Sequence, residues 1–308
     1  MKSKRFALVL FVPYVLHSLL AGSARAELKL PALFSDNMVL QQGQPVPVWG
    51  WADDGDKITV TIRGHKATTI AKDGKFCAVF HSLKAGGPDV LTVTAETRGH
   101  ITGRSLRFSN VLVGEVWVCS GQSNMEFPLK KSFEADPDVA SATNSQIRLF
   151  KVPRTRADCP TVLINSSWQM LKPETADSFS AVGYYFGRDL QAARNVPVGL
   201  IGTYWGGTPA EAWMSRPSLE VNERYKTEIL DKHTDWQKQM AEYEKRKTEA
   251  LKAGKEFNDK APGQPWASDL YNGMIAPLLF YGIKGAIWYQ GESNAPRAEQ
   301  YRTLFPDM

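Results

Sequence analysis

Residues 111–125 read VLVGEVWVCSGQSNM, and this stretch decides the fold. Its valine-rich part, as far as Cys119, shows little alternation, which is typical of a strand buried on both faces of a parallel sheet. Small and polar residues follow, where the chain must turn. Ligands gather at the carboxyl ends of such strands, so Ser123 lies where a nucleophile would be exposed. Many buried strands also end in glycine and serine, so the motif alone does not separate a catalytic serine from an ordinary turn.

Two further apolar runs repeat this arrangement. Val198–Tyr204 ends in a turn that begins Trp205-Gly206-Gly207-Thr208, and Ile283–Tyr289 ends in Gln290-Gly291-Glu292-Ser293-Asn294. If these are neighbouring parallel strands, their ends converge on one crevice. That crevice would hold a serine hydroxyl, a pair of glycine N–H groups and an asparagine amide, the groups that attack a carbonyl and hold the resulting oxyanion.

The three blocks GQSNM, WGGTPAEAW and WYQGESN resemble those of the SGNH hydrolases, in particular the secreted sialate O-acetylesterase-like carbohydrate esterases. The resemblance extends from about Leu30 to the last residue. It implies that Ser123 is the nucleophile and that the oxyanion donors are a backbone N–H of Gly206 or Gly207 and the side-chain amide of Asn294. In some related acetylxylan esterases a glutamate in a similar block is implicated as the triad acid, which implies that role for Glu292.

The first 26 residues are typical of a secretory signal peptide. Lys2, Lys4 and Arg5 precede an apolar stretch, and the small-x-small pattern around Arg25 predicts cleavage after Ala26. The apolar stretch is short for a membrane span and contains a proline. We expect a secreted or periplasmic protein with no membrane span in the mature chain.

The basic balance of the sequence comes from that segment. The chain has 37 basic and 32 acidic residues, and four of the basic ones lie in the first 26 residues. The mature net charge is therefore about +1, which gives no support for a nucleic-acid or membrane partner. The expected partner is an O-acetylated sugar or glycan, and the sequence leaves the oligomeric state open.

The three cysteines are Cys77, Cys119 and Cys159. An oxidising compartment permits one disulfide among them, whose pairing the sequence does not define. Cys119, on the strand before Ser123, is expected to be a small buried residue. No cysteine–histidine cluster has the spacing of zinc ligands, so neither a metal nor a cofactor is expected.

The length and the patterns predict two domains after the signal peptide. Residues 27–108 predict a small, jelly-roll-like β-sandwich, because short alternating runs are separated by turn clusters. The runs are Val46–Trp51, Ile58–Ile62 and Val90–Thr94, and the clusters are Asp53–Asp56, Lys72–Lys75 and Gly86–Asp89. Trp49 and Trp51 are expected in the core of the sandwich, although a sugar-stacking platform is the alternative.

Residues 109–308 alternate between strand and helix patterns, which predicts an α/β domain. The resemblance implies a flavodoxin-like parallel sheet with helices on both faces. Ile147–Val152 is a predicted strand. Ser180–Arg194 is a predicted helix that places Ala181, Tyr185, Phe186, Leu190 and Ala193 on one face. Residues 225–260 predict a charged helical insertion over or beside the crevice.

A general base for Ser123 is missing from the pattern. The family's Asp-x-x-His block follows block three, and no histidine follows Asn294. His233 precedes that block, has the wrong spacing and is expected to be a solvated helix residue. The resemblance therefore implies a hydrolase domain that is incomplete at its C-terminus.

Three functions remain open. The first is a carbohydrate O-acetylesterase that works through a serine acyl-enzyme, with little or no activity in this chain. The second is a secreted glycan-binding protein with the esterase fold. The third is a non-functional fragment, since missing sheet strands would expose an apolar face and an unpaired edge.

Overall fold

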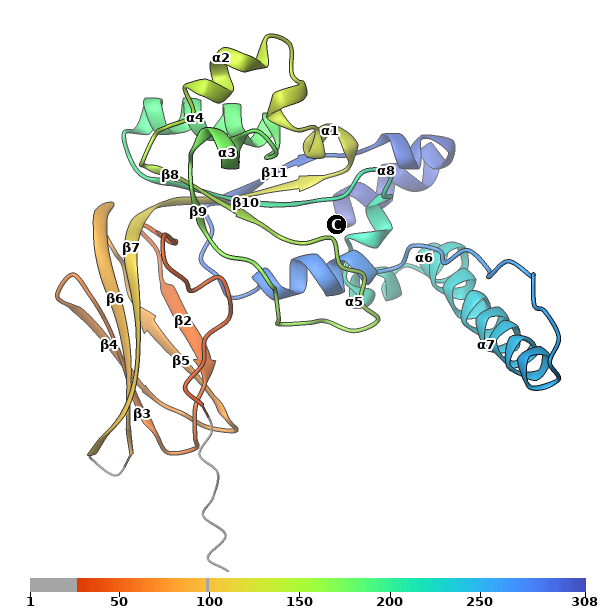
Figure 1. Ribbon diagram of the computed structural model, residues 1–308, viewed down its shortest axis with the longest axis horizontal. Helices are drawn as coiled ribbons and strands as arrows, with labels where there is room; N and C mark the ends of the chain where they lie inside the picture. The colour runs from red at the N-terminus through yellow and green to blue at the C-terminus, as the bar shows by residue number, and fades with distance from the viewer. Residues whose placement is uncertain (1–26, 98–99) are drawn as a thin grey trace, which may run out of the picture.

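The computed structural model describes residues 27–97 and 100–308, and its central feature is the long strand β7 (His100–Gly121). The first half of β7 pairs antiparallel with its N-terminal neighbour β6, and its second half pairs parallel with β10 and β11. One strand thus runs through both parts of the molecule (Figure 1). It crosses the predicted domain boundary after residue 108, so that division stays a prediction. The predicted signal peptide lies outside the described residues.

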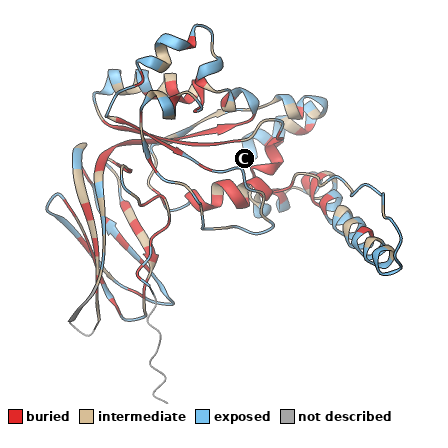
Figure 2. Cartoon of the chain, in the orientation of Figure 1, coloured by how far each residue is buried: buried red, intermediate tan, exposed pale blue. Residues whose placement is uncertain are grey.

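The C-terminal half of β7 lies in the middle of a parallel sheet. The strand order is β8–β10–β7–β11, and a short antiparallel strand, β9, pairs with the outer side of β8. Figure 2 shows that this half of β7 is almost continuously buried, as its valine-rich sequence predicts. The strands that join β7 here are β8 (Ile147–Lys151), β9 (Gln169–Met170), β10 (Val198–Tyr204) and β11 (Gly285–Tyr289).

The N-terminal part is built from strands that face each other in two layers (Figure 1), and all of its pairings are antiparallel except that of β1, which runs parallel to β7. The order β4–β3–β6–β7 forms one layer, β2 pairs with β5 in the other, and β1 adds to β7. In β2 and β5 every second residue is buried, which is the expected alternation of a sheet with one face in a core. These strands are β1 (Val39–Gln41), β2 (Val46–Trp51), β3 (Lys57–Ile62), β4 (His65–Ile70), β5 (Lys75–Phe80) and β6 (Gly86–Thr97).

One predicted turn in this part is wrong. The segment Gly86–Asp89 was expected to separate two strands, but it forms the start of β6, where the register against β7 shifts. Such an irregularity lets glycine and proline remain in a strand, because the extra residue breaks the regular ladder of hydrogen bonds.

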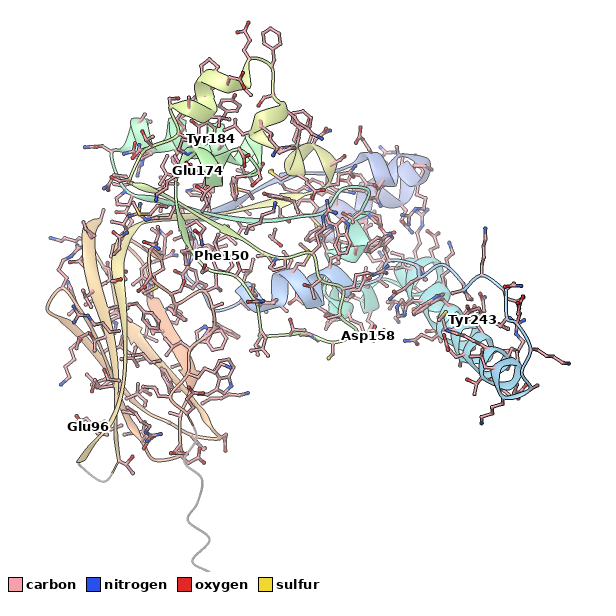
Figure 3. All side chains as sticks on the ribbon, in the orientation of Figure 1. Glu96, Phe150, Asp158, Glu174, Tyr184 and Tyr243 are labelled. Atoms are coloured by element: carbon pink, nitrogen blue, oxygen red, sulfur yellow. The ribbon has the colours of Figure 1, made fainter. Side chains whose placement is uncertain are left out.

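Helices cover both faces of the parallel sheet, with α2, α3 and α4 on one side and α5 on the other (Figure 1). Phe150 and Tyr184, labelled in Figure 3, lie in the two separate hydrophobic clusters on these faces. The α-helices are α1 (Ser123–Glu126), α2 (Ala135–Ala140), α3 (Pro173–Ala176), α4 (Ala181–Arg194), α5 (Arg216–Glu220), α6 (Glu223–Tyr225), α7 (Asp231–Lys252) and α8 (Ala298–Asp307). The expectation of an α/β fold is confirmed.

Helix α4 begins where predicted, at the cap Ser180, and all but one of the residues predicted on its apolar face belong to or pack against the adjoining hydrophobic cluster. Gly183 and Gly187 are buried against the sheet, whereas Ala193 is exposed. A Cβ on Gly187 would lie 2.6 Å from a methyl carbon of Leu200 on β10. The helix therefore approaches the sheet through its glycines, a contact that a pattern based on large apolar residues does not show.

The charged insertion forms α7, which projects away from the sheet (Figure 1). The returning segment packs along it, because the hydroxyl of Tyr243 donates to the carbonyl of Asp259 at 3.3 Å and the ring of Tyr243 contacts Phe257. Near the base of α7, His233 is buried, with 8% of its surface exposed. The expectation of a solvated histidine at this position is therefore wrong.

Candidate active site

The three predicted turns begin side by side at the carboxyl ends of three neighbouring strands. Gly121 on β7 is in register with Tyr204 on β10 and with Tyr289 on β11. Two backbone hydrogen bonds carry the pairing into the turns: the N–H of Gln122 donates to Tyr289 at 3.0 Å, and that of Trp205 donates to Gly121 at 3.1 Å. The structure thus brings together the three blocks that are far apart in the sequence.

The side chain of Gln122 joins block one to block three. Its oxygen accepts the N–H groups of Gly291 at 3.3 Å and Ser293 at 3.2 Å, and its nitrogen donates to the carboxylate of Glu292 at 3.1 Å. Gln122 itself is buried, with 3% of its surface exposed. Its amide satisfies backbone groups of the opposing turn and thereby fixes the distance between the two blocks.

Block two is joined to block three in the same way. The nitrogen of Gln290 donates to the carbonyl of Thr208 at 3.2 Å and to the side-chain oxygen of Asn294 at 2.7 Å. The same Asn294 oxygen accepts the N–H of Ala210 at 2.9 Å. With its oxygen so occupied, Asn294 has a fixed orientation and can offer only its nitrogen to a ligand.

Ser123 is the first residue of α1 and its side chain is exposed to solvent. Block two lies against it, because a Cβ built on Gly206 would be 3.4 Å from the Cβ of Ser123. In the part of the chain that the structure describes, the Ser123 hydroxyl has no hydrogen-bond partner. Its N–H lies in the first turn of a helix, where no acceptor is available within the helix.

Glu126 and Glu211 also belong to this site, although the sequence patterns did not single them out. Glu126 accepts the N–H of Gly206 at 2.7 Å, and Glu211 accepts a side-chain N–H of Asn294 at 2.9 Å. Each carboxylate is also paired with an arginine from another segment, Arg154 and Arg297 respectively. Glu126 stands three residues after Ser123 on the same helix, and that spacing is the only sequence signal that could have indicated it.

The remaining predicted residues, Gly207 and Glu292, are both exposed at this edge of the sheet. Gly207 has a φ of +76°, a conformation that favours glycine, and a Cβ there would meet no atom within 4 Å. Glu292 contacts Gln122, and no histidine is bound to it in the described chain.

The buried His233 lies in a different hollow, of about 480 Å³, together with Arg216, Asp269 and Tyr271. Burial lowers the pKa of His233. Burial also raises the pKa of Asp269, although the ion pair with Arg156 acts in the opposite direction and lowers it. None of the residues of the three blocks that were predicted to act in catalysis lines this hollow. The structure therefore gives no support for His233 as the base that would activate Ser123.

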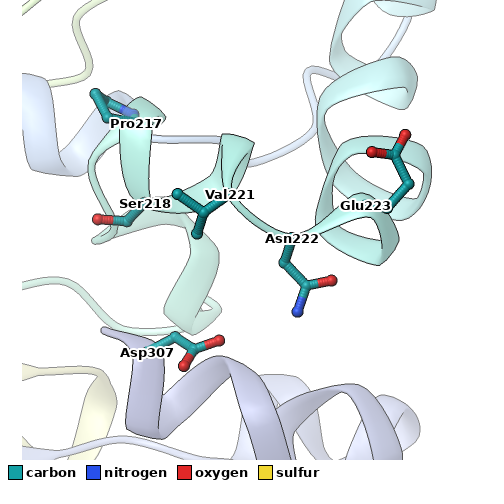
Figure 4. Close-up of a pocket in the computed structure, with 6 residues that line it drawn as sticks. All are labelled: Pro217, Ser218, Val221, Asn222, Glu223 and Asp307. Atoms are coloured by element: carbon teal, nitrogen blue, oxygen red, sulfur yellow. The ribbon is translucent and has the colours of Figure 1, made fainter.

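Two other hollows lie apart from the three blocks. One, of about 660 Å³, is lined by Asn222 and Asp307 among others and is shown in Figure 4. The other, of about 800 Å³, includes the half-buried Trp49 and Trp51 of the N-terminal part together with the exposed Phe280. The two tryptophans are thus only partly in the core, and the sugar-platform alternative remains open.

The cysteines of the structure are all free thiols. Cys119 is fully buried on β7, as predicted, whereas Cys77 and Cys159 are exposed. Burial raises the pKa of Cys119 to about 12. Residues 27–97 and 100–308 contain no group of His, Cys, Asp and Glu side chains that could hold a metal ion, and no helix among them is long and apolar enough to cross a bilayer.

Comparison with known proteins relates the chain to esterases. The chain is 31% identical to the sialate O-acetylesterase of Rattus norvegicus over 90% of its own length, and 30% identical to that of Homo sapiens over 93%. The chain is homologous to the sialate O-acetylesterases. It spans 54% of the rat protein and 53% of the human one, about half the length of the relatives it matches. No protein-family model matches the chain.

A solved structure supports the relationship. A carbohydrate acetylesterase from Xanthomonas citri shares 35% sequence identity with this homologue of the sialate O-acetylesterases, with a TM-score of 0.73. The match covers 91% of this chain and 56% of that one. Both parts of the present structure thus have counterparts in an esterase of known fold.

Proposed function

We propose that this protein removes O-acetyl groups from sugars through an acyl-enzyme on Ser123. The observation that supports the proposal is that the three turns start at the ends of paired strands and are hydrogen-bonded to one another, with Ser123 exposed and Gly206 packed against it. The names of the homologues support the choice of acetyl esters of sugars. Because the first 26 residues have the pattern of a signal peptide, we propose that the protein meets its substrate outside the cytoplasm.

In this mechanism the Ser123 oxygen forms a bond to the acetyl carbonyl carbon, and the carbonyl oxygen becomes an oxyanion. The Ser123 N–H, a block-two glycine N–H and the Asn294 amide stabilise that charge. When the oxyanion collapses, the bond to the sugar oxygen breaks, and the sugar leaves with the proton that the Ser123 hydroxyl gave up. Water then attacks the acetyl-serine ester, which releases acetate and restores the hydroxyl.

The step that this chain supports least is the removal of the serine proton. The described residues offer the Ser123 hydroxyl no hydrogen-bonded base, and the sequence after Asn294 contains no histidine. Glu292 would be a triad acid without a histidine to orient, which leaves the serine unactivated. We therefore expect slow turnover by the 308-residue chain.

Labelling with a fluorophosphonate, read by mass spectrometry, tests the nucleophile without requiring turnover of a sugar ester. One adduct, formed slowly because no base within the described residues activates the serine, is expected on the wild-type chain and none on Ser123→Ala. Ser293→Ala, which removes a half-buried serine of the same crevice, is the matched control and should keep the adduct. If Ser123→Ala is labelled as fast as the wild type, Ser123 is not the nucleophile.

Acetyl release from an O-acetylated sialic acid and from an acetylated xylo-oligosaccharide tests the reaction itself. Loss of one oxyanion donor costs about 10²–10³-fold in rate, so Asn294→Ala should fall by that factor wherever the wild type shows a measurable rate. Release that is unchanged in both Ser123→Ala and Asn294→Ala would contradict the proposal.

A glycan-binding protein without turnover is the second candidate, and it is favoured because the Ser123 hydroxyl has no hydrogen-bond partner within residues 27–97 and 100–308. Titration calorimetry with the same two ligands distinguishes the candidates. Binding without acetyl release or fluorophosphonate labelling would support the binding protein.

A further inference from the structure

Two carboxylates of the Ser123 site share one pattern of contacts. The first is Glu126, on the same short helix as Ser123. One of its oxygens accepts the Nε–H of Arg154 at 2.9 Å, and the other accepts the N–H of Gly206 at 2.7 Å. Its side chain is 22% exposed. The carboxylate thus joins the helix that carries the serine to the first glycine of block two.

The second carboxylate is Glu211, which follows block two. One oxygen accepts from Arg297 at 2.6 Å, and the other accepts from the side-chain nitrogen of Asn294 at 2.9 Å. Both Glu211 and Asn294 are buried, with 4% and 1% of their surfaces exposed. In each case, therefore, an arginine holds one carboxylate oxygen while the other oxygen holds a group that lines the predicted oxyanion site.

We propose that Glu126 and Glu211 are positioning residues that build the oxyanion site, and that Gly207 rather than Gly206 supplies its block-two N–H. This inference rests on the proposed esterase function and adds to it the residues that orient the donors.

The number of available hydrogens leads to this assignment. Gly206 has a single N–H, and Glu126 already accepts it. An oxyanion that shared this hydrogen would lie beside the carboxylate, and two like charges at contact distance repel. The Asn294 nitrogen carries two hydrogens, so one remains after the bond to Glu211. Gly207 is exposed and, among the described residues, its N–H has no acceptor.

The arginines have a definite electrostatic part in this arrangement. A bare carboxylate next to Ser123 would oppose the formation of an oxyanion, and a guanidinium paired with it offsets that charge. Arg154 also lies 5.5 Å from the ring centre of Trp205, the residue before Gly206. The ring therefore limits where the guanidinium can move, and the pair stays at the edge of the crevice.

Nuclear magnetic resonance of the full chain, labelled with ¹⁵N and ²H, tests the proposal without turnover. Sodium acetate is the probe, because its carboxylate oxygens resemble an oxyanion, and sodium chloride at equal ionic strength is the control. In the wild type, the backbone signal of Gly207 and the side-chain signal of Asn294 should shift saturably with acetate. The Gly206 signal should not.

Substitutions at Glu126 and Glu211 test whether each glutamate holds an oxyanion donor in place or only lies near it. Glu126→Ala should accelerate hydrogen exchange of the Gly206 amide by about 10-fold or more, because a hydrogen bond to a charged group is lost, and should weaken the acetate response of Gly207. Glu126→Gln keeps an acceptor oxygen and should restore both. Glu211→Ala should accelerate hydrogen exchange of the Asn294 side-chain amide and weaken its acetate response, and should leave Gly206 and Gly207 unchanged. The matched control is Glu299→Ala, an exposed glutamate of α8, which should change neither.

Each contrary result overturns the inference. Acetate that shifts Gly206 and not Gly207, or that shifts neither, removes the assignment to Gly207. An unchanged Gly206 exchange rate in Glu126→Ala removes the positioning role. These results do not depend on the esterase reaction. The proposed esterase function is refuted separately if Ser123→Ala keeps its labelling and acetyl release.

Discussion

Replacement of Gly121 by alanine should separate block three from block one. Gly121 has a φ of +140°, and a Cβ there would lie 2.7 Å from the carbonyl carbon and 2.9 Å from the nitrogen of Tyr289 on β11. Backbone strain at such a position costs about 1–3 kcal/mol. Overpacking against a neighbouring strand costs about 1–3 kcal/mol more. The free energy of unfolding should therefore fall by about 2–6 kcal/mol.

Urea unfolding followed by tryptophan fluorescence measures this loss. The matched control is Gly263→Ala, because a Cβ at Gly263 meets no atom within 4 Å and its backbone is not in the left-handed region. The control should stay within about 0.5 kcal/mol of the wild type. If Gly121→Ala is as stable as the wild type, then the backbone of β11 does not lie this close to Gly121. The argument for convergence of the three turns would then lose its main support.

Three further outcomes follow from buried groups. Because burial raises the pKa of Cys119 to about 12, its thiol should stay protonated at pH 8, and Ellman's reagent should count two thiols in the reduced native protein and three in urea; three fast thiols in the native state would contradict its burial. Burial lowers the pKa of His233 below its ordinary value of 6.5, so its contribution to stability is present above that pH and is lost as the pH falls. His233→Gln should therefore lose less unfolding free energy between pH 7.5 and 5.5 than the wild type, and equal losses would refute the assignment. Gln122→Ala leaves two N–H groups of the opposing turn without their acceptor and should cost about 1–3 kcal/mol of unfolding free energy; a neutral effect would show that water replaces the amide.

The strands and turns that carry the predicted site residues were predictable because their signals are local. The run before Ser123 is continuously apolar, the turn after it is small and polar, and two other runs repeat the arrangement. The strand Val46–Trp51 and the start of the helix at Ser180 were also predicted correctly, since alternation and helix capping depend on neighbouring residues.

The interactions that complete the site were not predictable in this way. Glu126 contacts Gly206, 80 residues later, and Glu211 contacts Asn294, 83 residues later. An isolated glutamate in a sequence has no pattern that announces such a partner. The burial of His233 likewise depends on packing around the base of α7, whereas its own neighbours in the sequence are polar or charged.

The sequence by itself determined the three apolar strands that precede the blocks, the turns at their ends and the chemistry of the groups in those turns, because these depend on side chains a few residues apart. The tertiary structure alone decided that one strand, β7, serves both parts of the molecule and that its last residue pairs on both sides. It also decided which N–H groups at the crevice already have an acceptor, because a hydrogen bond is a contact in space and its two partners here lie far apart in the sequence.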